Sequence, residues 1–83
     1  MPVYETAFTP QFLETFKKID RHQQDKVIKR LERIAQAPEL GKPLHAPLNH
    51  YKSERLESYR IIYRTHGNVV EFAWLDKRKK AYE

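Results

Sequence analysis

The sequence predicts a single α+β domain in which an antiparallel sheet is covered on one face by a helical hairpin. Three patterns support this prediction: an alternating N-terminal segment, two consecutive amphipathic helices, and a C-terminal half built of alternating segments. The expected order of elements is β-α-α-β-β-β. A chain of 83 residues has room for one domain, so residues 1–83 are expected to form one unit.

The N-terminal third predicts a strand followed by a helix. Residues 3–8 alternate apolar and polar side chains, as a strand does. Thr9 and Pro10 predict a helix start, because Thr9 can accept from free N–H groups and Pro10 needs no donor at the first helical position. The apolar face of this helix has three- and four-residue spacing: Phe12, Leu13, Phe16 and Ile19.

A second helix is predicted over residues 21–36, with Asp20 as its N-cap and Gln23 as the capping-box partner. Pro38 ends it, because the residue before a proline avoids helical geometry. Its apolar stripe consists of Val27, Ile28, Leu31, Ile34 and Ala35. Since one capping residue separates the two helices, they are expected to form a hairpin.

The C-terminal half predicts a connector and a strand meander. Residues 39–49 are expected to be the connector, because prolines are dense there. Strands are predicted over residues 52–57, 59–65 and 69–75, with Gly67 in the hairpin turn. The alternation places Tyr59, Ile61 and Tyr63 under the helices, and Arg60, Ile62 and Arg64 on the uncovered face.

Composition excludes several classes of protein. The chain has no cysteine, which excludes disulfides and thiolate chemistry. No apolar run approaches the roughly 20 residues of a spanning helix, and the N-terminus does not resemble a secretion signal, so a cytoplasmic location is expected. His45 and His50 share the connector but lack a third ligand, so no metal or other cofactor is expected.

The positive charge is concentrated in the C-terminal half. The net charge is +5, of which residues 1–41 contribute +1 and residues 42–83 contribute +4. A basic half indicates a polyanionic partner, either nucleic acid or an acidic protein. The alternative is a solvated surface that only keeps the protein soluble.

Four segments resemble the RelE/ParE superfamily of toxins from type II toxin–antitoxin systems. The run SYRIIY at residues 58–63 and the tail KRKKAY at residues 77–82 are similar to the family's C-terminal signature. Residues 9–20 are similar to its first helix, and residues 41–44 to its GKPL connector. The resemblance covers nearly the whole chain and implies a RelE-like fold with a basic concave face.

The same resemblance implies the activity and the partners. Many RelE-like members cleave translated mRNA in the ribosomal A site without a metal, whereas ParE-like members inhibit DNA gyrase. We therefore expect a ribosome-dependent mRNA endoribonuclease. A gyrase inhibitor, or an interaction module that has lost its toxicity, is the alternative. Expected partners are a cognate RelB-like antitoxin in a hetero-oligomer, the ribosome and mRNA, but not a membrane.

By the resemblance, Arg60, Arg78 and Tyr82 match catalytic positions of the family, and Lys52 lies near another. Cleavage by 2′-OH attack needs a base, cationic donors for the phosphorane and an acid for the leaving oxygen. The remaining basic positions are expected to bind RNA or the ribosome: Arg55, Arg64, Lys77, Lys79 and Lys80.

Each of these residues also has a structural interpretation. Arg60 could pair with Glu57 or Glu71, and Arg78 could be one charge of a solvated tail. Lys52 could be an ordinary surface lysine, and Tyr82 could pack against the sheet edge. Two acidic residues, Glu54 and Glu57, either weaken phosphate binding or supply the base. The aromatic set of Tyr59, Tyr63, Phe72 and Trp74 is expected in the core more than as a base-stacking platform.

Overall fold

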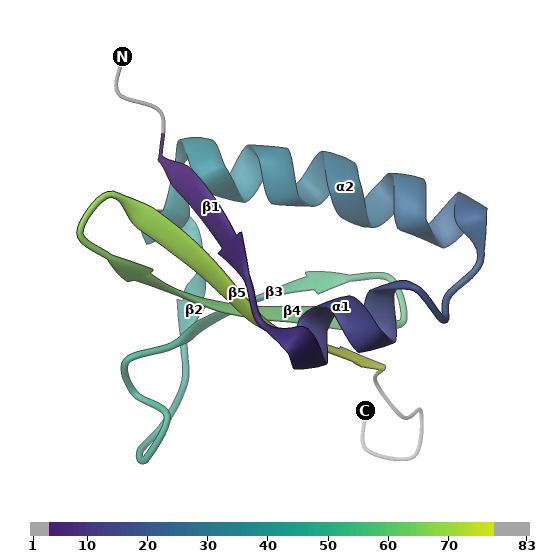
Figure 1. The fold of residues 1–83 in the computed structure, drawn as a ribbon. Coiled ribbons are helices and arrows are strands. Elements are labelled where there is room, and N and C mark those ends of the chain that lie inside the picture. Colours follow the sequence, from purple (N-terminus) through teal and green to yellow (C-terminus); the bar gives the residue numbers. More distant parts are fainter. Residues whose placement is uncertain (1–3, 78–83) are drawn as a thin grey trace.

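The computed structural model describes residues 4–77, which form two helices, a short 3-10 helix and one five-stranded sheet (Figure 1). The elements in chain order are β1 (Glu5–Phe8), α1 (Pro10–Phe16), α2 (Arg21–Gln36), the 3-10 helix η1 (Pro38–Leu40), β2 (Lys42–Pro43), β3 (Lys52–Leu56), β4 (Tyr59–His66) and β5 (Val69–Lys77). The α+β class and the succession of predicted elements are therefore confirmed.

The sheet is mixed, and in this respect the predicted antiparallel sheet is wrong. The strand order is β1-β5-β4-β3-β2, and β2 to β5 run antiparallel to their neighbours. The first strand runs parallel to β5, with Glu5 opposite Val69 and Phe8 opposite Phe72. Local alternation identifies a strand but says nothing about its distant partner. Between β1 and β5 the chain forms both helices and the strands β2 to β4, so no local pattern predicts this parallel pair.

Both predicted N-cap residues are confirmed, but the reciprocal capping-box bond of the Gln23 side chain is not formed among the described residues. The Thr9 hydroxyl oxygen accepts from the Phe12 amide at 3.1 Å and donates to the Ala73 carbonyl at 2.6 Å. The Asp20 carboxylate accepts from the Gln23 amide at 2.9 Å. Thr9 therefore caps α1 and also fastens it to β5.

Two elements differ from the predicted bounds. Helix α1 ends at Phe16, three residues before Ile19, which is the last residue of the predicted apolar face. Ile19 still packs against the core. The connector contains a two-residue strand, because Lys42 lies opposite Ser53 and Pro43 lies opposite Lys52. A strand this short, with a proline in it, leaves no alternating pattern in the sequence.

The core lies between the helices and one face of the sheet. Its fully buried side chains come from both helices and the two longest strands: Phe12, Val27, Ile34, Ile61, Tyr63, Val70 and Phe72. Figure 1 shows α2 lying across this face of the sheet. The other face has no helix over it among residues 4–77.

Tyr63 joins the core to the start of the connector. Its hydroxyl donates to the Pro38 carbonyl at 2.7 Å, and burial raises the pKa of this phenol to about 12. A Cβ at Gly41 would lie 2.0 Å from the same hydroxyl oxygen, so only glycine fits there. The position at which β2 begins is therefore fixed by the core.

No helix within residues 4–77 combines the length and the apolar character needed to cross a lipid bilayer.

Candidate nucleic-acid interface

The uncovered face of the sheet gathers basic side chains from three neighbouring strands. Paired residues on antiparallel strands project to the same side. Arg55 lies opposite Arg60, and Ser53 lies opposite both Ile62 and Lys42. Ile61, on the other side, is fully buried under the helices. The prediction that Arg60 projects from the uncovered face is therefore confirmed.

A pocket of about 280 Å³ opens on this face, where β2, β3, β4 and the connector meet. Its lining contains two arginines, a lysine, a histidine and a hydroxyl among seven residues: Lys42, Pro43, Leu44, His45, Ser53, Arg55 and Arg60. Hydrogen-bond donors from separate strands thus converge on one concavity. Such an arrangement suits an anionic group such as phosphate.

Arg55 and Arg60 form no ion pair with any residue in the described range 4–77. The two carboxylates named from the sequence as partners of Arg60 are bound elsewhere, and Asp76, which lies opposite Arg60 on β5, forms no ion pair with it. Glu57 pairs with Lys26, and Glu71 pairs with Arg64. Guanidinium groups held on strands, without a carboxylate, are available for an external anion.

Arg64 shares the uncovered face but is already neutralised. Its Nε donates to the Glu71 carboxylate at 2.7 Å, and this bond raises the pKa of Arg64 above its usual value. Its guanidinium also lies 5.4 Å from the centre of the Tyr51 ring, which in turn packs against Trp74 at 5.3 Å. The predicted role of Arg64 in RNA binding is weaker for this reason; instead it fastens the end of the connector to the sheet.

The structure does not bring Lys52 together with Arg60, so grouping these two residues in one site was wrong. Lys52 lies opposite Tyr63, and Tyr63 projects toward the helices. The alternation of β3 therefore places Lys52 on the helix side and Arg55 on the uncovered side. Because Lys52 and Arg55 are three positions apart, strand alternation alone puts them on opposite faces, and the pairing with β4 shows which face each one takes.

The two acidic residues of this region also lie away from the pocket. Glu54 accepts from Arg30 on α2 at 3.1 Å, with both side chains largely buried. Glu57 has a positive φ of 54° in the turn before β4, and its hydrogen bond from Lys26 lowers the pKa of its carboxyl. Neither carboxylate therefore opposes phosphate binding at Arg60.

The basic tail is described only at its start. Lys77 ends β5 and lies opposite Tyr59. Four predicted site residues lie outside the described residues: Arg78, Lys79, Lys80 and Tyr82.

Three of the four aromatic residues discussed for stacking are in the core, as expected: Tyr59, Tyr63 and Phe72. Trp74 differs, because it lies opposite Ile62 on the uncovered face and is partly exposed.

Three polar lining residues of the pocket were not predicted as site residues: Lys42, His45 and Ser53. The pairing of β2 with β3 brings them there, and Ser53 alone could have been found from the alternation of its strand. Within residues 4–77, no group of three or more His, Cys, Asp or Glu side chains could hold a metal ion.

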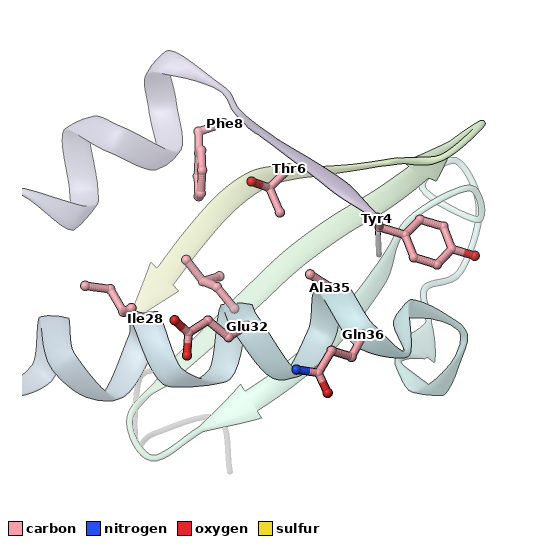
Figure 2. Close-up of a pocket in the computed structure, with 8 residues that line it drawn as sticks. Tyr4, Thr6, Phe8, Ile28, Glu32, Ala35 and Gln36 are labelled. Atoms are coloured by element: carbon pink, nitrogen blue, oxygen red, sulfur yellow. The ribbon is translucent and has the colours of Figure 1, made fainter. Parts of the chain in front are cut away.

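A second concave surface lies between β1 and α2, away from the basic pocket (Figure 2). This groove, of about 510 Å³, is mainly apolar and is lined by Tyr4, Thr6, Phe8, Ile28, Leu31, Glu32, Ala35 and Gln36. Phe8 projects from β1 toward α2, and Phe8 and Ile28 remain 40% and 43% exposed. Ile28 thus borders the groove, although the sequence had placed it in the core stripe.

The fold and the pocket together define a class of protein: a small α+β domain whose sheet presents unpaired arginines on one open face. Residues 7–82 match the family described as the ParE toxin of the type II toxin–antitoxin system parDE. The chain therefore belongs to this toxin family, as the sequence resemblance predicted.

Solved structures of related toxins have the same fold. A chain of the toxin–antitoxin complex RelBE2 from Mycobacterium tuberculosis is 25% identical, with a TM-score of 0.83 over 93% of this chain and 100% of that one. The isolated Escherichia coli RelE toxin is 18% identical, with a TM-score of 0.80 over 95% and 90%. A chain of the chromosomal ParDE system from Pseudomonas aeruginosa is 11% identical, with a TM-score of 0.77 over 93% and 98%. No curated protein sequence matches the chain.

Proposed function

We propose that this toxin is a ribosome-dependent endoribonuclease that cleaves translated mRNA at the pocket on the uncovered face of its sheet. One observation carries the proposal: Arg55 and Arg60 face each other in a concave site, and neither pairs with a carboxylate within residues 4–77. The resemblance to RelE-like toxins implies that cationic side chains carry out RNA cleavage without a metal. Groups that served only solubility would not need to converge in a pocket.

The chemistry follows from these donors. The 2′-hydroxyl attacks the adjacent phosphorus and the 5′ oxygen leaves, so negative charge builds on the non-bridging oxygens. Arg60 is held between two buried residues of β4 and can bind these oxygens with two parallel N–H groups. Arg55 contributes from the facing strand. We assign Arg78 and Tyr82 to the same reaction by their family positions, and Lys77, Lys79 and Lys80 to attraction by ribosomal RNA.

Primer extension on translated mRNA after induction of the toxin tests this proposal. New 5′ ends inside coding regions, which disappear in the Arg60→Ala variant, are the expected result. Growth arrest with intact transcripts would reject the nuclease. Normal growth with intact transcripts would favour an interaction module without toxicity.

The second candidate is a gyrase inhibitor, which is favoured by the family description itself, since that names ParE of parDE. Binding to gyrase does not require a phosphate pocket, so substitution of Arg60 should leave inhibition intact. Blocked supercoiling by the purified toxin, together with uncut mRNA, would establish this alternative.

We also propose an antitoxin partner that binds the groove between β1 and α2. Three of the related structures are complexes of a toxin with an antitoxin or an antitoxin peptide, and this groove exposes the apolar side chains that an amphipathic segment would cover. An acidic antitoxin would also complement the net charge of +5. The resulting assembly is a toxin–antitoxin hetero-oligomer.

Co-purification with the product of the neighbouring open reading frame, which we expect to be a short acidic protein, tests the partner. Ile28→Gln should weaken the complex by about tenfold or more, because it removes an apolar contact at the groove. Lys29→Gln, one position along α2 and outside the groove lining, is the matched control. Equal binding by both variants would place the antitoxin elsewhere.

A further inference from the structure

The basic pocket contains many donors and almost no proton acceptors. Lys42, Arg55 and Arg60 carry N–H groups only, and a guanidinium does not release its proton in proteins. The Ser53 hydroxyl is a weak base. Among the described lining residues, only the imidazole of His45 can act as a proton acceptor in this way.

The backbone holds His45 at the rim of this pocket. The His45 carbonyl accepts from the Leu48 amide at 2.9 Å, which closes a four-residue turn. The Leu44 amide donates to the Tyr51 carbonyl at 3.1 Å, which closes the base of the connector. Tyr51 is in turn held by Trp74 and Arg64. His45 therefore belongs to a connector that is tied to the sheet at both ends.

The described carboxylates near this face either form ion pairs or lie outside the pocket. Glu71 binds Arg64, and Glu54 binds Arg30 on the helix side. Asp76 lies opposite Arg60 on β5 but does not line the pocket. Within residues 4–77, Asp76 is thus the competing acceptor that an experiment must separate from His45.

We infer that His45 is the general base of this site and removes the proton of the attacking 2′-hydroxyl. As the O2′–P bond forms, this proton passes to the imidazole. The P–O5′ bond then breaks, and the 5′ oxygen takes a proton from an acid of the site. The products are a 2′,3′-cyclic phosphate and a 5′-hydroxyl end. The atoms and charges of this transesterification balance without an oxidant or a second reactant. The inference rests on the proposed nuclease function.

Single-turnover cleavage of ribosome-bound mRNA by His45→Ala tests this role, with His50→Ala as matched control. Both histidines are exposed residues of one connector, but only His45 lines the pocket. We expect a loss of about 100- to 10,000-fold for His45→Ala and less than about threefold for His50→Ala. The charged side chains that line the pocket together with His45 are all cationic: Lys42, Arg55 and Arg60.

The dependence of the rate on pH separates a base from a structural residue. The wild-type rate should rise with pH as the imidazole loses its proton, and His45→Ala should lack that rise. Asp76→Asn should keep it. A His45→Ala enzyme that cleaves normally, or that is slower but has an unchanged pH profile, overturns the inference. So does a rise that vanishes in Asp76→Asn. If the wild-type protein cuts no mRNA on ribosomes, the nuclease proposal itself fails, and His45 has no reaction to serve.

Discussion

The two faces of the sheet use the same residue types for different purposes. On the helix side, two cations of α2 bind carboxylates of the β3–β4 hairpin: Lys26 binds Glu57, and Arg30 binds Glu54. On the open side, Arg55 and Arg60 have no such partner within residues 4–77. Charges that hold α2 to the β3–β4 hairpin are thus kept apart from charges that can bind a phosphate. The difference shows that the position of a charge in the sheet, and not its type, sets its role.

Two adjacent isoleucines give the sharpest test of this contrast. Ile61 is fully buried under the helices, and Ile62 is 5% exposed on the face without them. Ile61→Ala should lower the free energy of unfolding by about 4–5 kcal/mol, and Ile62→Ala by about 2 kcal/mol, because fewer atoms surround Ile62. Urea denaturation followed by circular dichroism measures both. If Ile61→Ala does not fold, Ile61→Val should still cost about 1 kcal/mol. Equal costs at the two positions would contradict the comparison.

Substitutions of two arginines on the uncovered face should also differ in their effect on mRNA cleavage. Arg60→Ala should reduce mRNA cleavage by about 100- to 1,000-fold, the usual cost of losing one donor to a charged transition state. Arg64→Ala should reduce it by less than about tenfold, since Arg64 already binds Glu71. Quantitative primer extension on folded variants measures both. Similar losses for the two variants would show that the ion pair of Arg64 opens when RNA binds.

Alkaline pH should lower the free energy of unfolding through Tyr63, which is buried under the helices. In the unfolded chain this phenol ionises near its ordinary pKa of 10.0, whereas in the folded protein burial holds the pKa at about 12. The folded state therefore binds more protons between these values, so stability is complete below pH 10 and falls as pH rises to 12. The loss should reach about 2–3 kcal/mol. Urea denaturation at several pH values should show a smaller loss in Tyr63→Phe, and an unchanged loss would assign it to other groups.

The smallest change in stability is expected for the ion pair between Arg30 and Glu54 on the helix side of the sheet. Glu54→Gln should cost about 1 kcal/mol of stability, because it weakens the bond to Arg30 in a largely buried setting. Cleavage of mRNA should stay within twofold of wild type, since Glu54 projects away from the pocket. Cleavage reduced 100-fold in a folded Glu54→Gln protein would instead make this carboxylate part of the reaction.

The sequence predicted the local structure well, because local structure depends on neighbouring residues. The bounds of α2, its Asp20 cap and the exposed side of Arg60 all follow from side-chain periodicity and capping chemistry. The parallel pairing of β1 with β5 and the strand β2 do not follow from it. Both depend on contacts between distant segments that no local pattern records.

The candidate site could be predicted only in part for the same reason. Arg60 and Arg55 are found from strand alternation combined with the family signature. Lys42 and His45 enter the pocket only because β2 pairs with β3, and Lys52 leaves it because the register places it beside Tyr63. A one-residue difference in register moves a side chain to the opposite face.

The parallel pairing of β1 with β5 has a consequence for biosynthesis. Within residues 4–77, β1 is the first element to be synthesised, and the strand beside it in the sheet, β5, is the last. Phe12 likewise packs on Phe72, so α1 lacks its main contact until that strand emerges. Translation must therefore proceed past residue 77 before the nascent chain can close its sheet, and an incomplete chain cannot assemble the domain.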